Sequence, residues 1–341
     1  MKRLQVTVGV LLAAFLLAAA FGAVQLNRFL NSPMDIGEAG ADFLIESGSS
    51  FRAVSDELED RGYIDNSVLL RLWARWTGQA GSIHAGDYYI RAGTTPAELL
   101  DQFTSGDVKL YSFTIVEGWN HRELLTALQA SEHVTATLTD EDWPGLLAEL
   151  GNQGGHPEGL FLPETYRFPR NTSDREVLRQ AYELMQNVLE EEWGARAEEL
   201  SVTTPYEALI LASIIEKETA RGDERQRISG VFSRRLEKSM RLQTDPTVIY
   251  GIGPDFNGNL TRRDLRTDTP YNTYTRAGLP PTPIAMPGRA AIHAALHPAQ
   301  GDELYFVATG LEDGSHTFST TKEEHDAAVT EYLRRLRQNR K

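Results

Sequence analysis

The chain has 341 residues, 34 basic against 48 acidic side chains, a formal net charge of −14 at pH 7 and no cysteine. This length suffices for one large or two ordinary domains. The missing cysteines exclude disulfide scaffolds, thiol catalysis and cysteine-ligated metal centres. The excess of acid argues against nucleic acid as a partner, because neutralising phosphates requires a basic surface.

The N-terminus predicts a membrane-spanning helix. An uncharged apolar run, Leu4 to Asn27, follows Lys2 and Arg3. At about 1.5 Å per residue, a helix of this length crosses a bilayer core of about 30 Å. The basic residues before the run predict a cytoplasmic N-terminus and an exported remainder by the positive-inside rule.

We therefore expect the cytoplasmic N-terminus and transmembrane helix in residues 1–27 and a polar stalk in residues 28–41. The alternative is a cleaved signal peptide, because the small residues of Ala18–Ala23 offer a processing site.

Residues 42–118 predict a small α+β unit. Alternating and helical hydrophobic periodicities predict, in chain order, a strand at 42–46, helices at 51–62 and 68–76, a strand at 84–90, a helix at 95–103 and a strand at 111–115. The opening strand, turn and two helices resemble a LysM-type glycan-binding module. The alternative is a spacer domain that holds the next unit above the membrane.

Residues 119–341 predict a larger, mixed α+β unit, so the fold class of the whole chain is α+β. Predicted helices cover 122–130, 140–150 and 174–193, and residues 151–168 between them are expected to form a loop. Near the end of the chain we expect a strand at 304–309 and a helix that begins at about Thr321.

A helix with a well-specified start carries the most informative residues. Thr204, Pro205 and Glu207 form the pattern of an N-cap, a first helical proline and a capping-box glutamate. At 100° per residue, Glu218 shares the face of the apolar residues three, four and seven positions before it, whereas Glu216 points about 200° away. Glu218 therefore ends an apolar stripe.

Such a position favours a carboxyl group that remains protonated near neutral pH, because an apolar environment disfavours its charged form. A protonated carboxyl is the general acid that cleavage of an acetal requires. The alternative for Glu218 is a salt bridge with Arg221 or Arg225.

A bend with many polar groups follows. Pro246 pushes Asp245 out of the helical region, and Asp245 is equally well placed to cap a helix that starts at this proline. Tyr250 and Tyr274 add aromatic faces, which suit a sugar better than a phosphate, although both tyrosines also suit a half-buried core position.

The remaining candidates are weaker. His293 and His297 lie four apart, but the glutamate of a zinc-protease helix is missing between them, so no metal site is predicted. There is no glycine-rich phosphate loop, and no cofactor is predicted. We expect His316 and His325 to be structural.

Several motifs together resemble the endolytic murein transglycosylase family of bacteria, also called YceG-like. They are EGLFLPETY (158–166), ASIIEKET (212–219), LQTDPTVIYG (242–251), YNTY (271–274) and GLPP (278–281). Glu164 stands where members of the family often have Asp. The resemblance covers nearly the whole chain, and the family's catalytic glutamate matches Glu218.

The resemblance implies cleavage of nascent peptidoglycan strands between N-acetylmuramic acid and N-acetylglucosamine, with formation of 1,6-anhydro ends. Glu218 would act as general acid and then as base, and the C6 hydroxyl of the sugar would replace a second carboxylate. We expect the substrate to be bound by eight further residues: Gln243, Thr244, Asp245, Tyr250, Asn272, Tyr274, Glu164 and Tyr166.

The resemblance also places the catalytic domain outside the bacterial cytoplasmic membrane, beside glycan-polymerising synthases as partners. Two alternatives remain open. A hydrolytic muramidase would use Asp245 or another carboxylate to activate water. A non-catalytic, membrane-tethered scaffold would only bind peptidoglycan.

Overall fold

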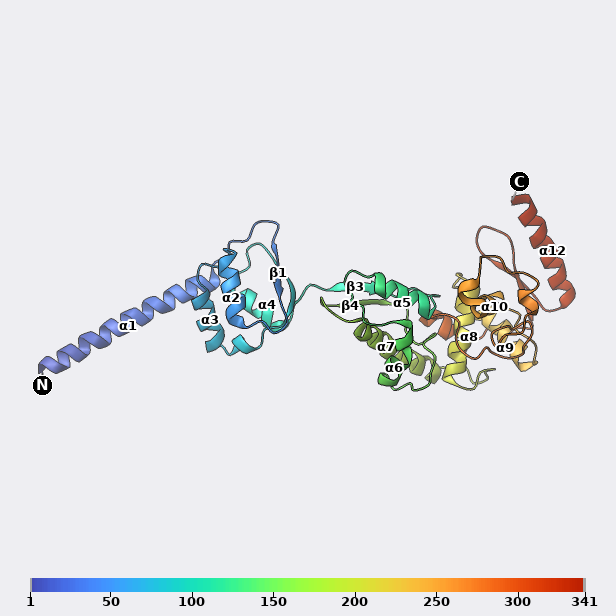
Figure 1. Cartoon of the computed structure of the whole chain (residues 1–341), viewed down its shortest axis with the longest axis horizontal. Helices are drawn as coiled ribbons and strands as arrows, with labels where there is room; N and C mark the ends of the chain where they lie inside the picture. The colour runs from blue at the N-terminus through green and yellow to red at the C-terminus, as the bar shows by residue number, and fades with distance from the viewer. Residues whose placement is uncertain (1, 340–341) are drawn as a thin grey trace. The chain divides into compact units, whose positions relative to one another are not determined.

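The computed structural model describes residues 2–339, so Met1, Arg340 and Lys341 lie outside the described part. The chain is a mixed α+β protein that divides into two compact units (Figure 1). The first unit extends to Tyr111 and includes Arg167–Arg170. The second contains Ser112–Tyr166 and the chain from Asn171 onward.

Helix α1 (Lys2–Asn31) contains the apolar N-terminal run. Its segment Thr7–Asn31 has a mean hydropathy of 2.4, and it is the one helix within residues 2–339 that is long and apolar enough to cross a membrane. Length and composition alone support this reading, and a signal sequence near the N-terminus has the same properties.

The segment expected as a polar stalk differs from that expectation. Residues 28–31 are the last turn of α1, and Leu30 and Met34 are buried. The backbone amide of Met34 donates to the carbonyl of Thr94 at 2.9 Å. The apolar residues Met34 and Ile36 of this segment pack in the core of the first unit, so the segment does not extend freely into solvent.

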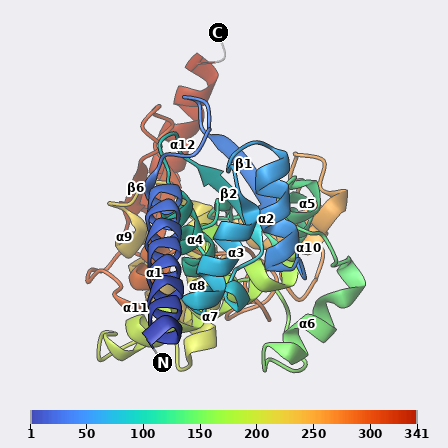
Figure 2. The same cartoon turned by 90° about the vertical axis from the view of Figure 1, so that its left-hand side faces the viewer.

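The first unit is a strand–helix–helix–strand–helix arrangement around one core (Figures 1 and 2). Its antiparallel sheet places Phe43 opposite Tyr88, and both side chains are buried. The elements are β1 (Ala41–Ile45), α2 (Phe51–Asp60), α3 (Ser67–Trp76), η1 (Gln79–Gly81), β2 (Gly86–Ile90) and α4 (Pro96–Ser105). Ser50, Asn66 and Thr95 cap the three helices with their side chains, as turn chemistry predicts.

Two short strands, β3 (Tyr111–Thr114) and β4 (Thr165–Phe168), form a second sheet. The prediction that residues 151–168 form only a loop is therefore wrong at its end. Along β4 buried and exposed residues alternate, but four residues are too short for this period to be distinguished in the sequence.

Helix α8 (Pro205–Glu218) is the central element of the second unit, and its residues 208–215 are all buried. It packs against its neighbours α7, α9, α10 and α11. The other elements of this unit are α5 (His121–Ala130), η2 (Asp140–Asp142), α6 (Trp143–Glu149), α7 (Asp174–Gly194), α9 (Arg225–Glu237), α10 (Asp245–Ile252), η3 (Gly253–Asp255), η4 (Asp264–Arg266), α11 (Arg289–Leu296), β5 (Tyr305–Ala308), β6 (His316–Ser319) and α12 (Lys322–Asn339). Strands β5 and β6 form an antiparallel hairpin.

Candidate active site

Glu218 is the last residue of α8, and the start of this helix is fixed as the sequence predicts. The Thr204 side chain accepts a hydrogen bond from the amide of Glu207, and Pro205 is the first helical residue. The Glu207 carboxylate binds the amide and hydroxyl of Thr203, so the capping box is only half formed. Since residues 208–215 of α8 are all buried, Glu218 follows a stretch of helix that is buried on every side and not only along one apolar stripe.

The Glu218 side chain lines a cavity of about 450 Å³. This volume lies within the range of ordinary small-molecule sites. Segments from six regions of the second unit meet here: the end of α8, helix α9, the start of α10 with the residues before it, the loop that contains Tyr274, the β5–β6 hairpin and the start of α12. The other lining residues are Arg235, Leu242, Gln243, Thr244, Asp245, Tyr274, Tyr305, Phe306, Val307, Ala308, His316, Lys322 and His325.

The pKa of the Glu218 carboxyl is raised above its ordinary value, mainly by burial and further by the negative charge of Asp245. The hydrogen bond that Thr244 donates, and the nearby His316, act in the opposite direction. The position of Glu218 at a helix C-terminus also disfavours its negative charge, because the carbonyl end of the helix dipole is negative.

The structure does not pair Glu218 with either expected arginine. Arg221 forms ion pairs with Asp223 at 2.7 Å and Asp313 at 3.6 Å. Arg225 approaches Glu216 at 3.5 Å. No ion pair to Glu218 is present among residues 2–339, so the salt bridge considered as the alternative for this residue does not form.

Glu216 lies in a different environment, as the helical spacing predicts. Its Oε2 accepts a hydrogen bond from the amide of Gly288 at 3.0 Å, and Arg225 lies beside its other oxygen. Burial raises the pKa of Glu216 as well. Glu216 does not line the Glu218 cavity among the described residues, so its contacts with the segment before α11 are structural.

Asp245 begins α10, but it is not the capping residue. The N-cap is Thr244, whose side chain makes no capping hydrogen bond, and Asp245 Oδ1 accepts from the Tyr274 hydroxyl at 2.6 Å. The pKa of Tyr274 is raised by burial and by this carboxylate. The cavity therefore contains a second carboxylate that is held by a tyrosine.

Gln243 occupies the left-handed backbone region with φ of 56°, which is uncommon for a residue with a side chain. Its amide donates to the Thr273 carbonyl at 3.2 Å, and the buried Arg235 guanidinium donates to the carbonyls of Arg241 and Leu242. Strain of about 1–2 kcal/mol persists only where the surroundings enforce it, and such positions cluster at functional sites.

His316, in another wall of the cavity, pairs with Glu224. His316 Nδ1 lies 2.7 Å from Glu224 Oε2, and the His316 amide donates to Glu224 Oε1 at 3.0 Å. Because a carboxylate accepts, Nδ1 carries the proton and Nε2 is the remaining ring nitrogen. Sequence analysis did not find Glu224, since 92 residues separate it from its partner and no local pattern links them.

Four residues expected to bind substrate lie elsewhere. Asn272 is 1% exposed, and its amide nitrogen donates to the carbonyls of Thr267 and Asp264 while its oxygen accepts from the amide of Tyr274. Tyr166 is buried, and its hydroxyl donates to the Leu162 carbonyl at 2.6 Å. These contacts hold the backbone in place, because neither side chain has free surface for a sugar.

Glu164 is exposed and does not line the Glu218 cavity among the described residues. Tyr250 lines a second cavity, between α5 and α10, and its hydroxyl donates to Glu158 Oε2 at 2.9 Å. Of the expected residues, the structure thus places Gln243, Thr244, Asp245 and Tyr274 around the cavity of Glu218.

Glu158, in the first position of the EGLFLPETY motif, is fully buried. It accepts hydrogen bonds from the His121 amide and from the Tyr250 hydroxyl, and His121 Nδ1 lies 2.7 Å from Oε2. The next residue, Gly159, has φ of 78°, and a Cβ there would lie 2.6 Å from the ring of Pro283. This motif therefore contacts α5, α10 and the segment that contains Pro283.

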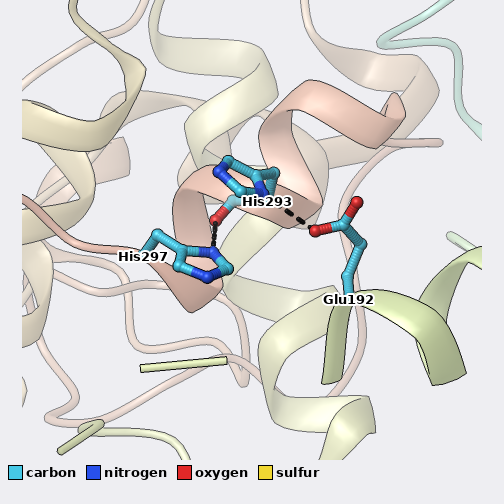
Figure 3. A group of neighbouring side chains, drawn as sticks. All are labelled: Glu192, His293 and His297. Carbon is cyan, nitrogen blue, oxygen red and sulfur yellow. Dashed lines mark hydrogen bonds and ion pairs between the residues drawn. The ribbon is translucent and has the colours of Figure 1, made fainter. Parts of the chain in front are cut away.

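His293 of α11 and His297, the residue that follows this helix, form a cluster with Glu192 of α7 (Figure 3). His293 Nδ1 lies 2.8 Å from Glu192 Oε2, and the two nitrogens of His297 lie 3.0 and 2.9 Å from the carbonyl oxygens of His293 and Ala195. A metal would need ring lone pairs directed at one point, whereas these nitrogens are directed at the carboxylate and at two carbonyls. The contacts join α7 to α11.

The chain from residue 43 to residue 331 matches the model of the YceG-like family. The chain belongs to the YceG-like family. It is 30% identical over 330 residues to the endolytic murein transglycosylase of Bacillus subtilis strain 168. The alignment covers 92% of this chain and 90% of that protein. This confirms the family that the sequence motifs indicate.

Another YceG-like relative is the endolytic murein transglycosylase of Streptococcus pneumoniae serotype 2, with 26% identity over 85% of this chain. The chain spans 58% of that protein's length. The crystal structure of a yceG-like protein of Listeria monocytogenes is similar with a TM-score of 0.54 and 28% identity, over 85% of this chain and 99% of that one. The YceG-like fold is thus shared along most of the chain.

Proposed function

We propose that this chain is an endolytic murein transglycosylase, which cleaves peptidoglycan strands between N-acetylmuramic acid and N-acetylglucosamine and leaves 1,6-anhydro ends. The observation that carries the proposal is Glu218, a carboxyl with a raised pKa and, among residues 2–339, no ion pair, in the wall of a cavity of saccharide size. The names of the relatives support the same activity.

The reaction needs one carboxyl that acts twice. Glu218 donates its proton to the glycosidic oxygen while the bond from this oxygen to C1 breaks. The resulting carboxylate accepts the proton of the C6 hydroxyl while O6 forms a bond to C1. No water is consumed, and the tethered hydroxyl replaces the second carboxylate of a hydrolase because its effective concentration is high.

The other cavity residues have supporting roles in this proposal. Thr244 orients the Glu218 carboxyl, and Asp245 keeps its pKa high. Gln243 and Tyr274 present an amide and an aromatic surface to the sugar. Asn272 and Tyr166 position backbone segments, and Glu164 and Tyr250 contact the strand outside the cavity of Glu218.

We propose that α1 anchors the chain in the bacterial cytoplasmic membrane, with the N-terminus inside and everything after the helix outside. The unit at 42–118 acts as a LysM-like glycan-binding domain, and residues 119–341 form the catalytic domain that acts beside glycan-polymerising synthases. The strand–helix–helix–strand order of the first unit supports the LysM-like assignment. Intact mass of the membrane-bound protein and protease accessibility on each side of the membrane test the anchor. Loss of the first two dozen residues would contradict it.

Product analysis tests the reaction. The purified full chain in detergent is incubated with glycan strands, and mass spectrometry counts anhydro and reducing ends. We expect anhydro ends from the wild type and a loss of about 10²–10⁴-fold for Glu218→Gln, the usual contribution of a general acid–base group. Glu190→Gln, the same change at an exposed position of α7, serves as control and retains the activity.

The alternatives give different products. Reducing ends would indicate a muramidase, for which the exposed Asp245 carboxylate on the same cavity is the candidate base. Glycan binding without any product, equal in wild type and Glu218→Gln, would indicate a scaffold.

A further inference from the structure

The second unit contains another cavity, of about 900 Å³, between α5 and the α10–η3 segment. Trp119 and Asn120 line one side, and Ile249 and Tyr250 line the other. Apart from the proposed strand contact of Tyr250, the proposed reaction makes no use of this cavity. It lies near the cavity of Glu218, because its lining includes Lys217 and Pro246, the chain neighbours of Glu218 and Asp245.

Two cations on this cavity lack an anionic partner. The Arg122 guanidinium lies beside Gly253, with Nη1 3.3 Å from the place that a Cβ on this glycine would take. Lys217 Nζ donates to the carbonyl of Gly118 at 3.0 Å. Within residues 2–339, neither Arg122 nor Lys217 forms an ion pair. Since acidic residues outnumber basic ones in this chain, two such cations on one cavity favour an anionic ligand.

The rest of the lining fits a ligand with an aliphatic part. Trp119, Ile249, Phe256 and Ile284 provide apolar surface, and Glu123, the one carboxylate of the lining, accepts a hydrogen bond from the amide of Asn120. An apolar surface with cations at its edge suits short aliphatic side chains that end in a carboxylate. A neutral sugar would leave both cations without a counter-charge.

We propose that this cavity binds the carboxylate-bearing peptide stem of the same glycan strand that enters the cavity of Glu218. The proposal rests on the proposed function, because the peptides attached to peptidoglycan carry carboxylates and lie close to the glycan bond that is cleaved. The muramic acid residue next to the cleaved bond carries such a peptide. The enzyme therefore distinguishes strands that bear stems from strands that do not.

The first experiment compares two substrates: uncrosslinked strands with stems, and the same strands after an amidase has removed them. For the full chain, kcat/KM is measured by the release of anhydro ends, and the ratio between substrates is the readout. We expect wild type to favour stem-bearing strands about tenfold, as for one charge-assisted hydrogen bond. Arg122→Gln and Lys217→Gln lower this ratio, Arg122→Lys retains much of it, and the exposed Arg262→Gln leaves it unchanged.

The second experiment separates this proposal from the reaction mechanism. The full chain with Glu218→Gln is titrated with a synthetic stem peptide that has free carboxylates and with its fully amidated form. We expect the free acid to bind and the amidated form to bind at least tenfold more weakly, with the difference lost in Glu218→Gln/Arg122→Gln. Equal binding of both peptides, or a wild-type substrate ratio of one, overturns the proposal even if Glu218 proves catalytic.

Discussion

Thr244 Oγ1 donates a hydrogen bond to Glu218 Oε1 and thereby joins the N-cap of α10 to the last residue of α8. Thr244 is 3% exposed, and its own backbone is held by Thr273, whose hydroxyl accepts from the Thr244 amide at 3.1 Å. Two helices and one loop thus determine where the carboxyl oxygen lies. The donor stabilises the ionised form more than the protonated one, so it opposes the effect of burial on the pKa.

Replacing Thr244 by Val removes this donor and keeps the shape of the side chain. The pKa of Glu218 then rises further, and a general acid remains protonated to higher pH. We expect the alkaline limb of kcat/KM to move to higher pH, since this limb reports the acid of the free enzyme. Thr244→Ser keeps the hydroxyl and serves as control. If the alkaline limb of Thr244→Val lay at the same pH as that of wild type, Thr244 would not influence the pKa of Glu218.

Asp245→Asn has the opposite expected effect. The Asp245 carboxylate raises the pKa of Glu218 by repulsion, so a neutral amide lowers it. The alkaline limb moves to lower pH, while anhydro ends remain the product. A complete loss of turnover with intact folding would instead indicate that Asp245 takes part in the chemistry, as a muramidase requires.

Glu218→Gln is expected to stabilise the fold at neutral pH. Because the pKa of Glu218 is higher in the folded state than in the unfolded chain, the native protein holds the proton to higher pH. Between the two pKa values the native state binds more protons, so wild-type stability falls as the pH rises. Glutamine cannot ionise and lacks this decline.

Thermal melts of the full chain, from about pH 4 to about pH 8, measure the effect. The Tm of Glu218→Gln minus that of wild type should grow with pH, and about 1 kcal/mol corresponds to roughly 2–4 °C for a domain of this size. Glu190→Gln serves as control. A constant or shrinking difference would show that this carboxyl is not destabilised by its site.

Gly159→Ala should be among the most destabilising small changes in the second unit. The new Cβ would lie 2.6 Å from two ring atoms of Pro283, in addition to the cost of a left-handed residue. Gly151 is the matched control, with φ of 81° and open space around its Cβ. We expect Gly151→Ala to lower the free energy of unfolding by about 1 kcal/mol, and Gly159→Ala to lower it by about 1–3 kcal/mol more. Thermal or denaturant unfolding measures both losses. Equal losses would mean that Pro283 can move aside.

The periodic elements follow from local rules, and these predictions are confirmed. Helix α8 begins at Pro205 after the Thr204 cap, and the antiparallel pair β1–β2 occupies the predicted segments. Local rules failed where elements are short or contacts are distant. The four residues of β4 are too few for a period, and Asp245 binds Tyr274, 29 residues away, instead of capping its helix.

The sequence by itself determined the family, the helix that carries Glu218 and the opposite directions of Glu216 and Glu218, because capping chemistry and helical period act over a few residues. Only the tertiary structure decided what surrounds the carboxyl. Thr244 lies 26 residues from Glu218 in the sequence, and His316, on the same cavity, lies 92 residues from its partner Glu224. The electrostatic interactions and the burial of a side chain depend on distances in space, and a local sequence pattern does not contain these distances.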